Sequence, residues 1–339
     1  MDKIGWGHGM EAVRWGILGA ASFAREQMAP AIHAAKGAKL CALATSDPEK
    51  AENFKHFCPD LQVHSSYDTL LADPAIEAVY IPLPNHLHLV WTLKALAAGK
   101  HVLTEKPIAM HAHEIDQIIQ ARDAAGKLAA EAFMIVFHPQ WQKAKEWVDA
   151  GEIGRIEHVD TAFSYDNRDD PANIRNRADT GGGGLRDIGV YTFGSVRYVT
   201  GAEPVDLQAR MIRENGIDTW AQVTGVMGNK AGRFTYSSMT SMRLSTRQEV
   251  VFQGEKGMIR LGSAPFNANL FDVAEVELHR PGLSVLTQRY PSANHYVLQV
   301  EAFCRSVREG VAYPCPLEFV KGTQSMIDRA FQVAEEISL

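Results

Sequence analysis

A short turn of small residues near the start of the chain limits its fold more than any other stretch. Residues 14–18 form a mostly apolar run, which breaks at Gly19, Ala21 and Ala24 before helical spacing begins. These residues lie at the spacing of a G-x-G-x-x-G turn, with alanine at the second and third positions. In such a turn, backbone N–H groups and the positive end of a helix face a site for phosphate groups. The stretch predicts a strand, a tight turn and a helix start.

The residues that follow give this turn its context. Apolar residues recur at helical spacing over 27–35, and residues 39–46 form an apolar run of strand length. A strand, a helix and a second strand over about 30 residues are the unit that binds a dinucleotide. The sequence therefore predicts a nucleotide-binding sheet at the amino-terminal end.

The end of the second predicted strand bears on the choice of dinucleotide. An acidic residue there binds the ribose 2′-hydroxyl of NAD, whereas basic residues accommodate the 2′-phosphate of NADP. The chain has Thr45 and Ser46 at this point, with Asp47 just beyond and Lys50 one helical turn later. The absence of a carboxylate at Thr45 favours NADP, although Asp47 leaves NAD open.

Two later strands end in residues that suit the same site. Residues 78–86 form a strand that stops at Pro82 and Pro84, and residues 100–107 form one that ends in Lys106. The carboxyl ends of parallel strands form the ligand-binding edge of such a sheet. We expect the cofactor to be bound by Gly19, Ala21, Ser22, Phe23, Thr45, Ser46, Lys50, Pro82, Asn85, His88, Glu105 and Lys106.

The rhythm of the chain changes beyond residue 154. Short, alternating or β-rich runs follow one another, separated by Gly, Asn and Pro, which is typical of an antiparallel sheet. We predict a flexible extension over 1–12, a dinucleotide-binding domain over 13–137 and a substrate-binding and oligomerisation domain over 138–339. The fold class is α/β: a doubly wound parallel sheet, then an α+β domain with a large open, mainly antiparallel sheet. A final helix is expected over 317–337.

Composition narrows the partners. The 339 residues carry a formal net charge of -6 with no run of like charges, which argues against nucleic acid or an anionic membrane. No apolar stretch approaches the ~18 residues of a membrane span, so we expect a cytoplasmic protein. The four cysteines lack metal-ligand spacing, and we expect neither disulfides nor a metal. His111 and His113 could bind a metal as a pair, but solvation at a helix start is favoured.

One helical segment carries groups that can move a proton. Asp187 and Tyr191 are four residues apart, so both project from the same face of a helix that follows four glycines, expected to be a flexible loop. A phenol beside a cation loses its proton more readily, and Lys106 is the candidate cation. Spacing alone favours the interpretation that Asp187 caps or pairs locally and that Tyr191 is a half-buried core residue.

The motifs together resemble the Gfo/Idh/MocA family of NAD(P)-dependent oxidoreductases over residues 13–339. The resemblance rests on the turn at Gly19, the segment 80–88, the Glu-Lys-Pro motif ending at Pro107 and the Asp-x-Gly-x-Tyr motif of residues 187–191. It implies that Lys106, Asp187 and Tyr191 are catalytic. A tyrosine instead of histidine at position 191 makes the chain most similar to the branch of glucose-fructose oxidoreductase, xylose dehydrogenases and dimeric dihydrodiol dehydrogenases.

The same resemblance implies a substrate pocket and an assembly. Its lining is expected to include Phe133, Asn173, Arg175, Asn294 and Tyr296. The chain has Ile135 and Val136 where many relatives have a Tyr-Arg pair, which puts strongly anionic sugars in doubt. The open sheet has a face too broad to remain hydrated, so we expect a homodimer or homotetramer formed through it.

These features predict a dehydrogenase that transfers a hydride between a monosaccharide or polyol and NADP or NAD. Two alternatives use the same site: a trans-dihydrodiol or 1,5-anhydrofructose type dehydrogenase or reductase, and a glycosidase that retains its cofactor. A protein that senses nicotinamide without catalysis is a further alternative, against which the intact Lys106, Asp187 and Tyr191 argue.

Overall fold

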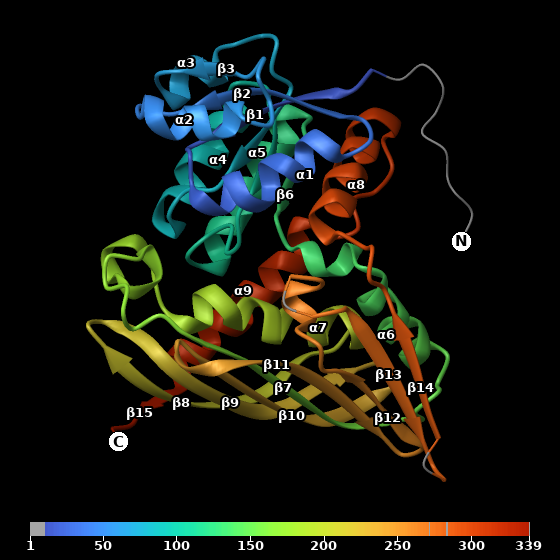
Figure 1. Ribbon diagram of the computed structural model, residues 1–339. Helices are drawn as coiled ribbons and strands as arrows, with labels where there is room; N and C mark the ends of the chain where they lie inside the picture. Colours follow the sequence, from blue (N-terminus) through green and yellow to red (C-terminus); the bar gives the residue numbers. More distant parts are fainter. Residues whose placement is uncertain (1–10, 271, 283, 339) are drawn as a thin grey trace. The chain divides into compact units, whose positions relative to one another are not determined.

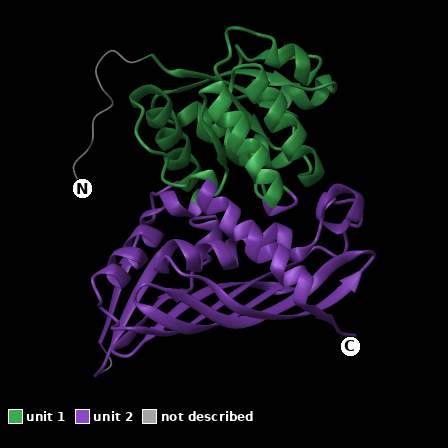
Figure 2. Cartoon of the chain, turned by 180° about the vertical axis from the view of Figure 1, so that it is seen from behind, with its two compact units in different colours: residues 1–109, 113–134, 295–317 green, residues 110–112, 135–294, 318–339 purple. Residues whose placement is uncertain are grey.

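The computed structural model describes residues 11–270, 272–282 and 284–338, which fall into two compact units. Unit 1 comprises residues 1–109, 113–134 and 295–317, and unit 2 comprises residues 110–112, 135–294 and 318–339 (Figure 2). Most of the predicted extension, residues 1–10, lies outside the described residues. Each unit has its own sheet, so each is described by itself.

Unit 1 is a doubly wound sheet of six parallel strands in the order β3-β2-β1-β4-β5-β6. Their bounds are β1 Val13–Leu18, β2 Ala38–Ala44, β3 Gln62–His64, β4 Ala78–Ile81, β5 His101–Thr104 and β6 Ala129–Glu131. The central strand β4 is buried at every residue because helices cover both faces of such a sheet. The predicted parallel sheet is confirmed.

The helical segments of this unit connect these strands, except the last one, which comes from a later part of the chain (Figure 1). They are η1 Ala24–Met28, α1 Ala29–Ala34, α2 Pro48–Lys55, α3 Tyr67–Leu71, η2 Asn85–Leu87, α4 His88–Ala97, α5 Ala112–Ala125 and α8 His295–Glu309. Local sequence explains where they begin: Asp47 accepts hydrogen bonds from the N–H groups of Glu49 and Lys50 at the start of α2.

Helix α8 differs from the domain boundaries expected from the sequence. It lies far along the chain, yet it packs in unit 1, where the rings of Trp15 and Phe303 are 4.8 Å apart. Arg308 of α8 donates hydrogen bonds to Glu77, at 2.8 and 2.9 Å. The nucleotide-binding unit is therefore completed by a late segment whose apolar face fits β1 and α1.

Unit 2 is built on a nine-stranded sheet in the order β14-β13-β12-β11-β7-β10-β9-β8-β15. Its strands are β7 Ile156–Asp166, β8 Glu203–Glu214, β9 Ile217–Asn229, β10 Gly232–Ser241, β11 Arg243–Gly254, β12 Gly257–Leu261, β13 Glu275–Arg280, β14 Ser284–Arg289 and β15 Ala334–Glu336. The pairs are antiparallel except β7 with β10 and β15 with β8, which confirms the mainly antiparallel sheet.

The carboxyl end of the chain corrects one expectation. The final helix, α9 (Leu317–Val333), ends earlier than predicted, and the next residues form the edge strand β15 against β8. The segment Ala334–Glu336 continues the helical pattern in sequence. Its pairing with Ala209–Met211 of β8 satisfies backbone groups that an edge strand would otherwise expose.

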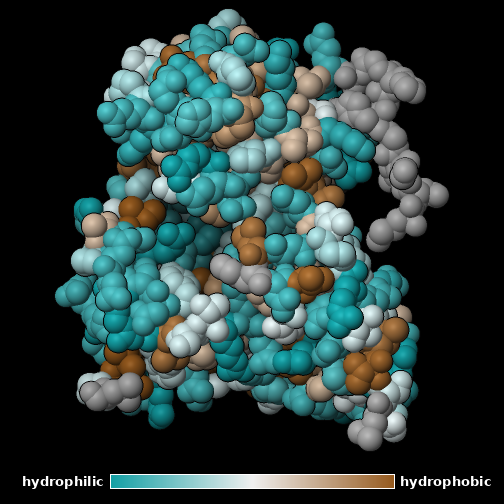
Figure 3. Space-filling view, viewed as in Figure 1, coloured by the Kyte–Doolittle hydropathy of each residue, from teal (hydrophilic) through white to brown (hydrophobic). Residues whose placement is uncertain are grey.

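The other helical segments of unit 2 are η3 Met134–Phe137, of which Met134 belongs to unit 1, α6 Pro139–Asp149, η4 Ile174–Asn176, η5 Ala178–Thr180, η6 Leu185–Gly189, α7 Val190–Thr200 and η7 Pro265–Asn267. Helices α6 and α7 lie on one face of the sheet (Figure 1). In the space-filling view the visible surface is mainly hydrophilic, with separate hydrophobic patches (Figure 3). Among the described residues, no helix has the length and apolar character needed to cross a membrane.

Candidate functional site

The turn at Gly19 has the shape that the sequence predicts for a phosphate-binding turn. Gly19 has a φ of +106°, and an added Cβ would lie 3.0 Å from Leu83 and 3.3 Å from the Tyr67 hydroxyl. Only glycine fits such a position without strain. Ser22 is exposed and Ala21 and Phe23 are half-buried, so the start of the following helix remains accessible. This turn fits the pyrophosphate of a dinucleotide.

The carboxylate that follows the end of β2, Asp47, uses one of its oxygens at the start of α2. This oxygen accepts the N–H groups of Glu49 and Lys50 at 3.0 and 3.2 Å. The hydroxyl of Thr45 accepts the N–H of Asp47, and Ser46 is exposed. The side chain of Lys50 is 63% exposed and lies 3.8 Å from Asp47. A hydroxyl pair with a nearby ammonium suits a 2′-phosphate better than a 2′-hydroxyl.

Three side chains from outside it, Tyr80, His88 and Glu131, hold the segment that carries Lys106. Glu105 accepts a hydrogen bond from the Tyr80 hydroxyl at 2.6 Å. The buried ring of His88 has its Nδ1 2.7 Å from the carbonyl oxygen of Pro107 and its Nε2 2.7 Å from that of Leu83. Burial lowers the pKa of His88 to about 4, while the two carbonyl contacts act in the opposite direction. His88, predicted to contact cofactor, is buried between two loops.

Glu131 is the third of these anchors, and sequence reasoning missed it. Its carboxylate lies at the end of β6, is 3% exposed and accepts the N–H of Ile108 at 2.9 Å. Burial raises its pKa to about 7. A glutamate in a buried apolar strand gives no periodicity signal, so only the contact with a distant loop identifies its role.

Among the other predicted residues of unit 1, Tyr296 lies beside the cofactor turn, and Phe133, Pro82 and Asn85 differ in burial. The ring of Tyr296 packs edge-on against Phe23, with centroids 5.6 Å apart, so this predicted substrate residue lies beside the predicted cofactor turn. Burial raises the pKa of Tyr296 above its usual value. Phe133 and Pro82 are buried, and Asn85 is half-buried at the start of η2.

Unit 2 brings Asp187 and Arg175 together. Arg175 Nε is 3.0 Å from Asp187 Oδ1, and the Tyr165 hydroxyl donates to Asp187 Oδ2 at 2.6 Å. The side chain of Asp187 is 11% exposed and that of Arg175 is 40% exposed, so the carboxylate is buried while part of the arginine side chain is accessible. The negative charge of Asp187 raises the pKa of Arg175, and burial together with that same charge raises the pKa of Tyr165. The pair is overall neutral.

The glycine loop before Asp187 is closely packed, which corrects the expected flexible loop. The N–H groups of Gly182 and Gly183 bond the carbonyl oxygens of Arg177 and Arg175, at 2.9 and 3.0 Å. Asn173 accepts the N–H of Arg175 at 3.1 Å and so fixes the turn that presents the guanidinium. The two predicted pocket residues are thereby tied to the loop in front of the helix. Asn294, the other predicted residue of this unit, is exposed before α8.

Tyr191 lies in an aromatic cluster that sequence reasoning did not foresee. Its ring centroid is 5.9 Å from that of Phe163 and 5.6 Å from that of Phe266, and Phe266 also stacks on Trp141 at 5.6 Å. Tyr191 is 7% exposed and Phe266 is fully buried. The cluster fixes the phenol ring and supplies an apolar wall beside it.

The segment that carries Phe266 is held by buried polar side chains. Gln248 Oε1 accepts the N–H groups of Phe266 and Asn267, both at 3.1 Å. The carbonyl oxygen of Pro265 accepts from Gln140 at 2.9 Å and from the Trp141 indole at 3.1 Å. These residues lie on three separate elements, so their spacing in sequence carries no signal.

Lys106 belongs to unit 1, whereas Asp187 and Tyr191 belong to unit 2, and the pairing of Lys106 with Tyr191 stays a prediction. His111 and His113 are both exposed. In the ranges that the structure describes, no cluster of three or more His, Cys, Asp or Glu side chains is placed to hold a metal ion.

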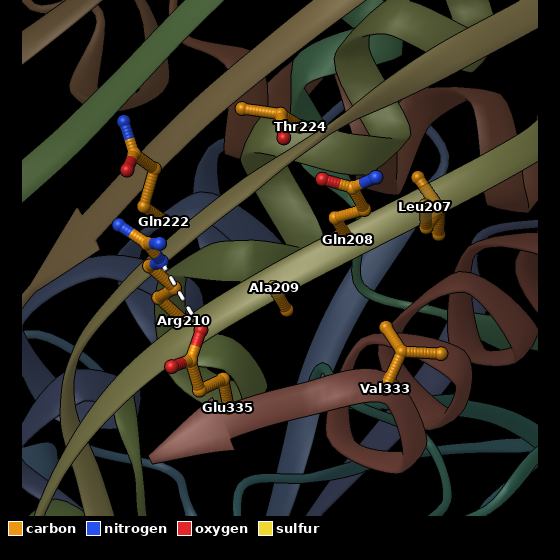
Figure 4. Close-up of a pocket in the computed structure, with 8 residues that line it drawn as sticks. All are labelled: Leu207, Gln208, Ala209, Arg210, Gln222, Thr224, Val333 and Glu335. Carbon is orange, nitrogen blue, oxygen red and sulfur yellow. Dashed lines mark ion pairs between the residues drawn. The ribbon is translucent and has the colours of Figure 1, made fainter. Parts of the chain in front are cut away.

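A surface pocket of about 400 Å³ lies on β8 and β9 beside β15 (Figure 4). An ion pair between Arg210 and Glu335, 3.4 Å apart, lies at its rim. Its lining consists of Leu207, Gln208, Ala209, Arg210, Gln222, Thr224, Val333 and Glu335. None of these is a predicted site residue, so this pocket is separate from the groups described above.

Known proteins match both units. Residues 13–133 match the domain described as "Oxidoreductase family, NAD-binding Rossmann fold", and residues 141–260 match the "GFO/IDH/MocA C-terminal domain". The chain is 36% identical over 332 residues to the oxidoreductase ORF334 of Rhizobium meliloti, covering 96% of this chain and 98% of that one. It is 32% identical to a D-xylose 1-dehydrogenase (NADP(+)) of Haloferax volcanii, covering 95% and 97%.

Among solved structures, the chain resembles KijD10, a 3-ketoreductase of Actinomadura kijaniata in complex with NADP and TDP-benzene. The TM-score is 0.87 at 26% identity, with 97% of this chain and 100% of that one covered. A trans-1,2-dihydrobenzene-1,2-diol dehydrogenase of Xenopus tropicalis is 28% identical over 257 residues, covering 74% of this chain and 76% of that one.

Proposed function

Because the chain belongs to the GFO/IDH/MocA family of oxidoreductases, we propose that it oxidises a carbinol carbon of a monosaccharide or polyol to a carbonyl, or reduces that carbonyl to the carbinol, with a nicotinamide dinucleotide. The observation that carries the proposal is the group around Asp187. This carboxylate contacts both Arg175 and Tyr165, and it lies on η6, directly before the helix α7 that bears Tyr191. A bound nicotinamide supplies the hydride acceptor or donor.

The proposed roles follow from what each side chain can do. Tyr191 exchanges a proton with the substrate hydroxyl, and the aromatic rings of Phe163 and Phe266 hold its phenol in one orientation. Arg175 interacts electrostatically with Asp187, Tyr165 and Tyr191. Its positive charge favours the deprotonated form of the Tyr191 phenol. Lys106 is proposed as a catalytic residue from its motif.

We further propose a neutral substrate. The charge of Arg175 is offset by Asp187, and the sequence has no Tyr-Arg pair at Ile135 and Val136. A guanidinium paired in this way retains N–H groups for sugar hydroxyls, but attracts an anion less than an unpaired one. The relative of Haloferax volcanii, a D-xylose 1-dehydrogenase, supports an aldose as substrate.

For the cofactor we propose NADP. The support comes from the side chains that follow β2. Asp47 accepts N–H groups at the start of α2, and Thr45, Ser46 and Lys50 supply hydroxyls and an ammonium for a 2′-phosphate. The names of the xylose dehydrogenase and of KijD10 in complex with NADP agree with this choice.

A dihydrodiol dehydrogenase is the second candidate function. The rings of Phe163 and Phe266 make the surroundings of Tyr191 apolar, which suits a less hydroxylated substrate, and the Xenopus tropicalis relative is named for such a diol. Both functions use the same residues, so only a substrate panel separates them.

The experiment is a panel of pentoses, hexoses, polyols and a trans-dihydrodiol with NADP and NAD, followed by the absorbance of the reduced nicotinamide. We expect turnover with an aldose and NADP, and none with the diol. The variant Lys106→Ala should abolish turnover while the Kd for NADP changes by less than about tenfold. Turnover with the diol alone would favour the second candidate, and retained turnover in Lys106→Ala would refute the role of Lys106.

We propose that the chain forms a homodimer or homotetramer through the sheet of unit 2. Helices α6 and α7 cover one face (Figure 1). The other face alternates side chains such as Gln208, Arg210 and Gln222 with buried ones, as a strand with a solvated face does. A nine-stranded sheet offers a broad surface on this side, on which a second copy of the chain could pack by the same residues in both copies. Light scattering that gives the mass of one chain would refute this proposal.

A further inference from the structure

We propose that Asp218 is a positioning residue, which holds the segment bearing Asp187 and Tyr191 in its working conformation. Asp218 lies at the start of β9, distant in sequence from that segment, and is buried, with 1% of its surface exposed. The catalytic part of this inference rests on the proposed function, because it concerns the same two residues.

The first observation is a buried hydrogen bond. Asp218 Oδ2 accepts the N–H of Leu185, the first residue of η6, at 2.7 Å. The first N–H groups of a helical segment have no partner within the segment, and a carboxylate there also favours the helix dipole. The next contact continues into the site, because the N–H of Asp187 bonds the carbonyl oxygen of Gly183 at 3.0 Å. Asp218 therefore fixes the turn from which Asp187 projects.

The second observation is the shape of the glycine loop. Gly183 has a φ of +116°, and an added Cβ would overlap Asp218 Oδ1. A Cβ on Gly184 would lie 3.2 Å from Asp218 Oδ2. The carboxylate thus occupies the space that side chains at these positions would need. The run of glycines in the sequence marks the approach of this distant side chain.

The third observation is the energetic cost of the arrangement. Burial raises the pKa of Asp218 to about 6, with the N–H of Leu185 and the charge of Arg186 acting in the opposite direction. A carboxylate this buried is expensive to ionise. Asparagine has the same shape and keeps an acceptor oxygen for the N–H of Leu185 without the charge, so Asp218→Asn is the conservative variant that tests the hydrogen bond separately from the charge.

The first test measures position directly. Hydrogen exchange followed by mass spectrometry is compared for wild type, Asp218→Ala and Asp218→Asn. We expect Asp218→Ala to speed exchange of peptides within 185–200 by at least about tenfold while peptides of unit 1 are unchanged. Asp218→Asn should keep the wild-type pattern, because its side-chain oxygen can still accept the N–H of Leu185. Unchanged exchange in Asp218→Ala, or equal changes in both units, would overturn the proposal.

The second test measures the reaction with the aldose found active in the panel. Asp218→Ala should lower kcat by about tenfold or more with an unchanged Kd for NADP, and Asp218→Asn should recover kcat to within about threefold. Gly183→Ala should reproduce the loss, and the double variant with Asp218→Ala should be no worse than the poorer single variant. Gly201→Ala is the matched control, since Gly201 also has a positive φ, of +62°, but has open space for a Cβ. Wild-type kcat in Asp218→Ala would overturn the proposal.

The two tests separate the two proposals. If wild type turns over no substrate of the panel, the proposed function fails, and the exchange data still decide whether Asp218 positions this segment. If wild type is active and the exchange of peptides within 185–200 does not respond to Asp218→Ala, the inference about Asp218 fails by itself.

Discussion

Replacing Glu131 by Gln is expected to stabilise the protein at neutral and alkaline pH. The carboxylate is buried, and it accepts a hydrogen bond from the N–H of Ile108 at 2.9 Å. Gln has the same shape and keeps an oxygen that can accept this N–H. The substitution therefore removes a buried charge while the hydrogen bond is retained.

The size of the effect follows from the pKa. Burial raises the pKa of Glu131 from 4.5 to about 7 in the folded chain. Between these values the folded state binds more protons than the unfolded state, so the free energy of unfolding falls as the pH rises from 4.5 to about 7. Above that range the loss is complete, at about 3 kcal/mol for 1.36 kcal/mol per pKa unit. The Gln side chain does not titrate, so the variant avoids this loss.

Scanning calorimetry from about pH 5 to about pH 8 measures the difference. We expect the Tm of Glu131→Gln to exceed that of wild type by roughly 6–12 °C at the upper end, for a unit of about 150 residues, and by much less at the lower end. Glu309→Gln, an exposed glutamate at the end of α8, is the control and should follow wild type. A variant that is equally or less stable than wild type at about pH 8 would refute the reasoning.

Two further substitutions test the sites in each unit. Phe266→Leu removes the ring that packs on Tyr191, so it should lower the free energy of unfolding by about 1–2 kcal/mol and lower kcat more than it changes KM. An unchanged kcat would show that the cluster does not orient the phenol of Tyr191. Thr45→Asp should shift the preference from NADP toward NAD by at least about tenfold in kcat/KM, because a carboxylate repels the 2′-phosphate; steady-state kinetics with both cofactors measure this, and an unchanged ratio would place the ribose elsewhere.

The sequence predicts those parts of the fold that depend on local spacing. The turn at Gly19 and the strands that follow it repeat a pattern of apolar runs and helices, so the doubly wound parallel sheet can be predicted from neighbouring residues. The alternating runs beyond residue 154 likewise predict the mainly antiparallel sheet. Helix α8 could not be assigned to unit 1 in this way, because its apolar face fits β1 and α1 only in three dimensions.

The candidate site, like the fold, can be predicted from the sequence only where local spacing or a motif marks the residues. Asp187 and Tyr191 are recognisable as candidates because they belong to the Asp-x-Gly-x-Tyr motif of residues 187–191, next to a glycine run. Asp218 bonds the N–H of Leu185, and the ring of Phe266 packs on that of Tyr191, yet both residues lie on other elements and no spacing connects them to the motif. Glu131 is similar, since a glutamate at the end of an apolar strand becomes informative only through its bond to Ile108.

The most direct test of the central claim is the kinetics of Tyr191→Phe. This variant keeps the ring among Phe163 and Phe266 and removes only the hydroxyl that we propose exchanges the substrate proton. Loss of a general acid or base lowers the rate by about 10²–10⁴-fold, so we expect kcat to fall into that range while the Kd for NADP stays within about threefold. A kcat within about threefold of wild type would contradict the account.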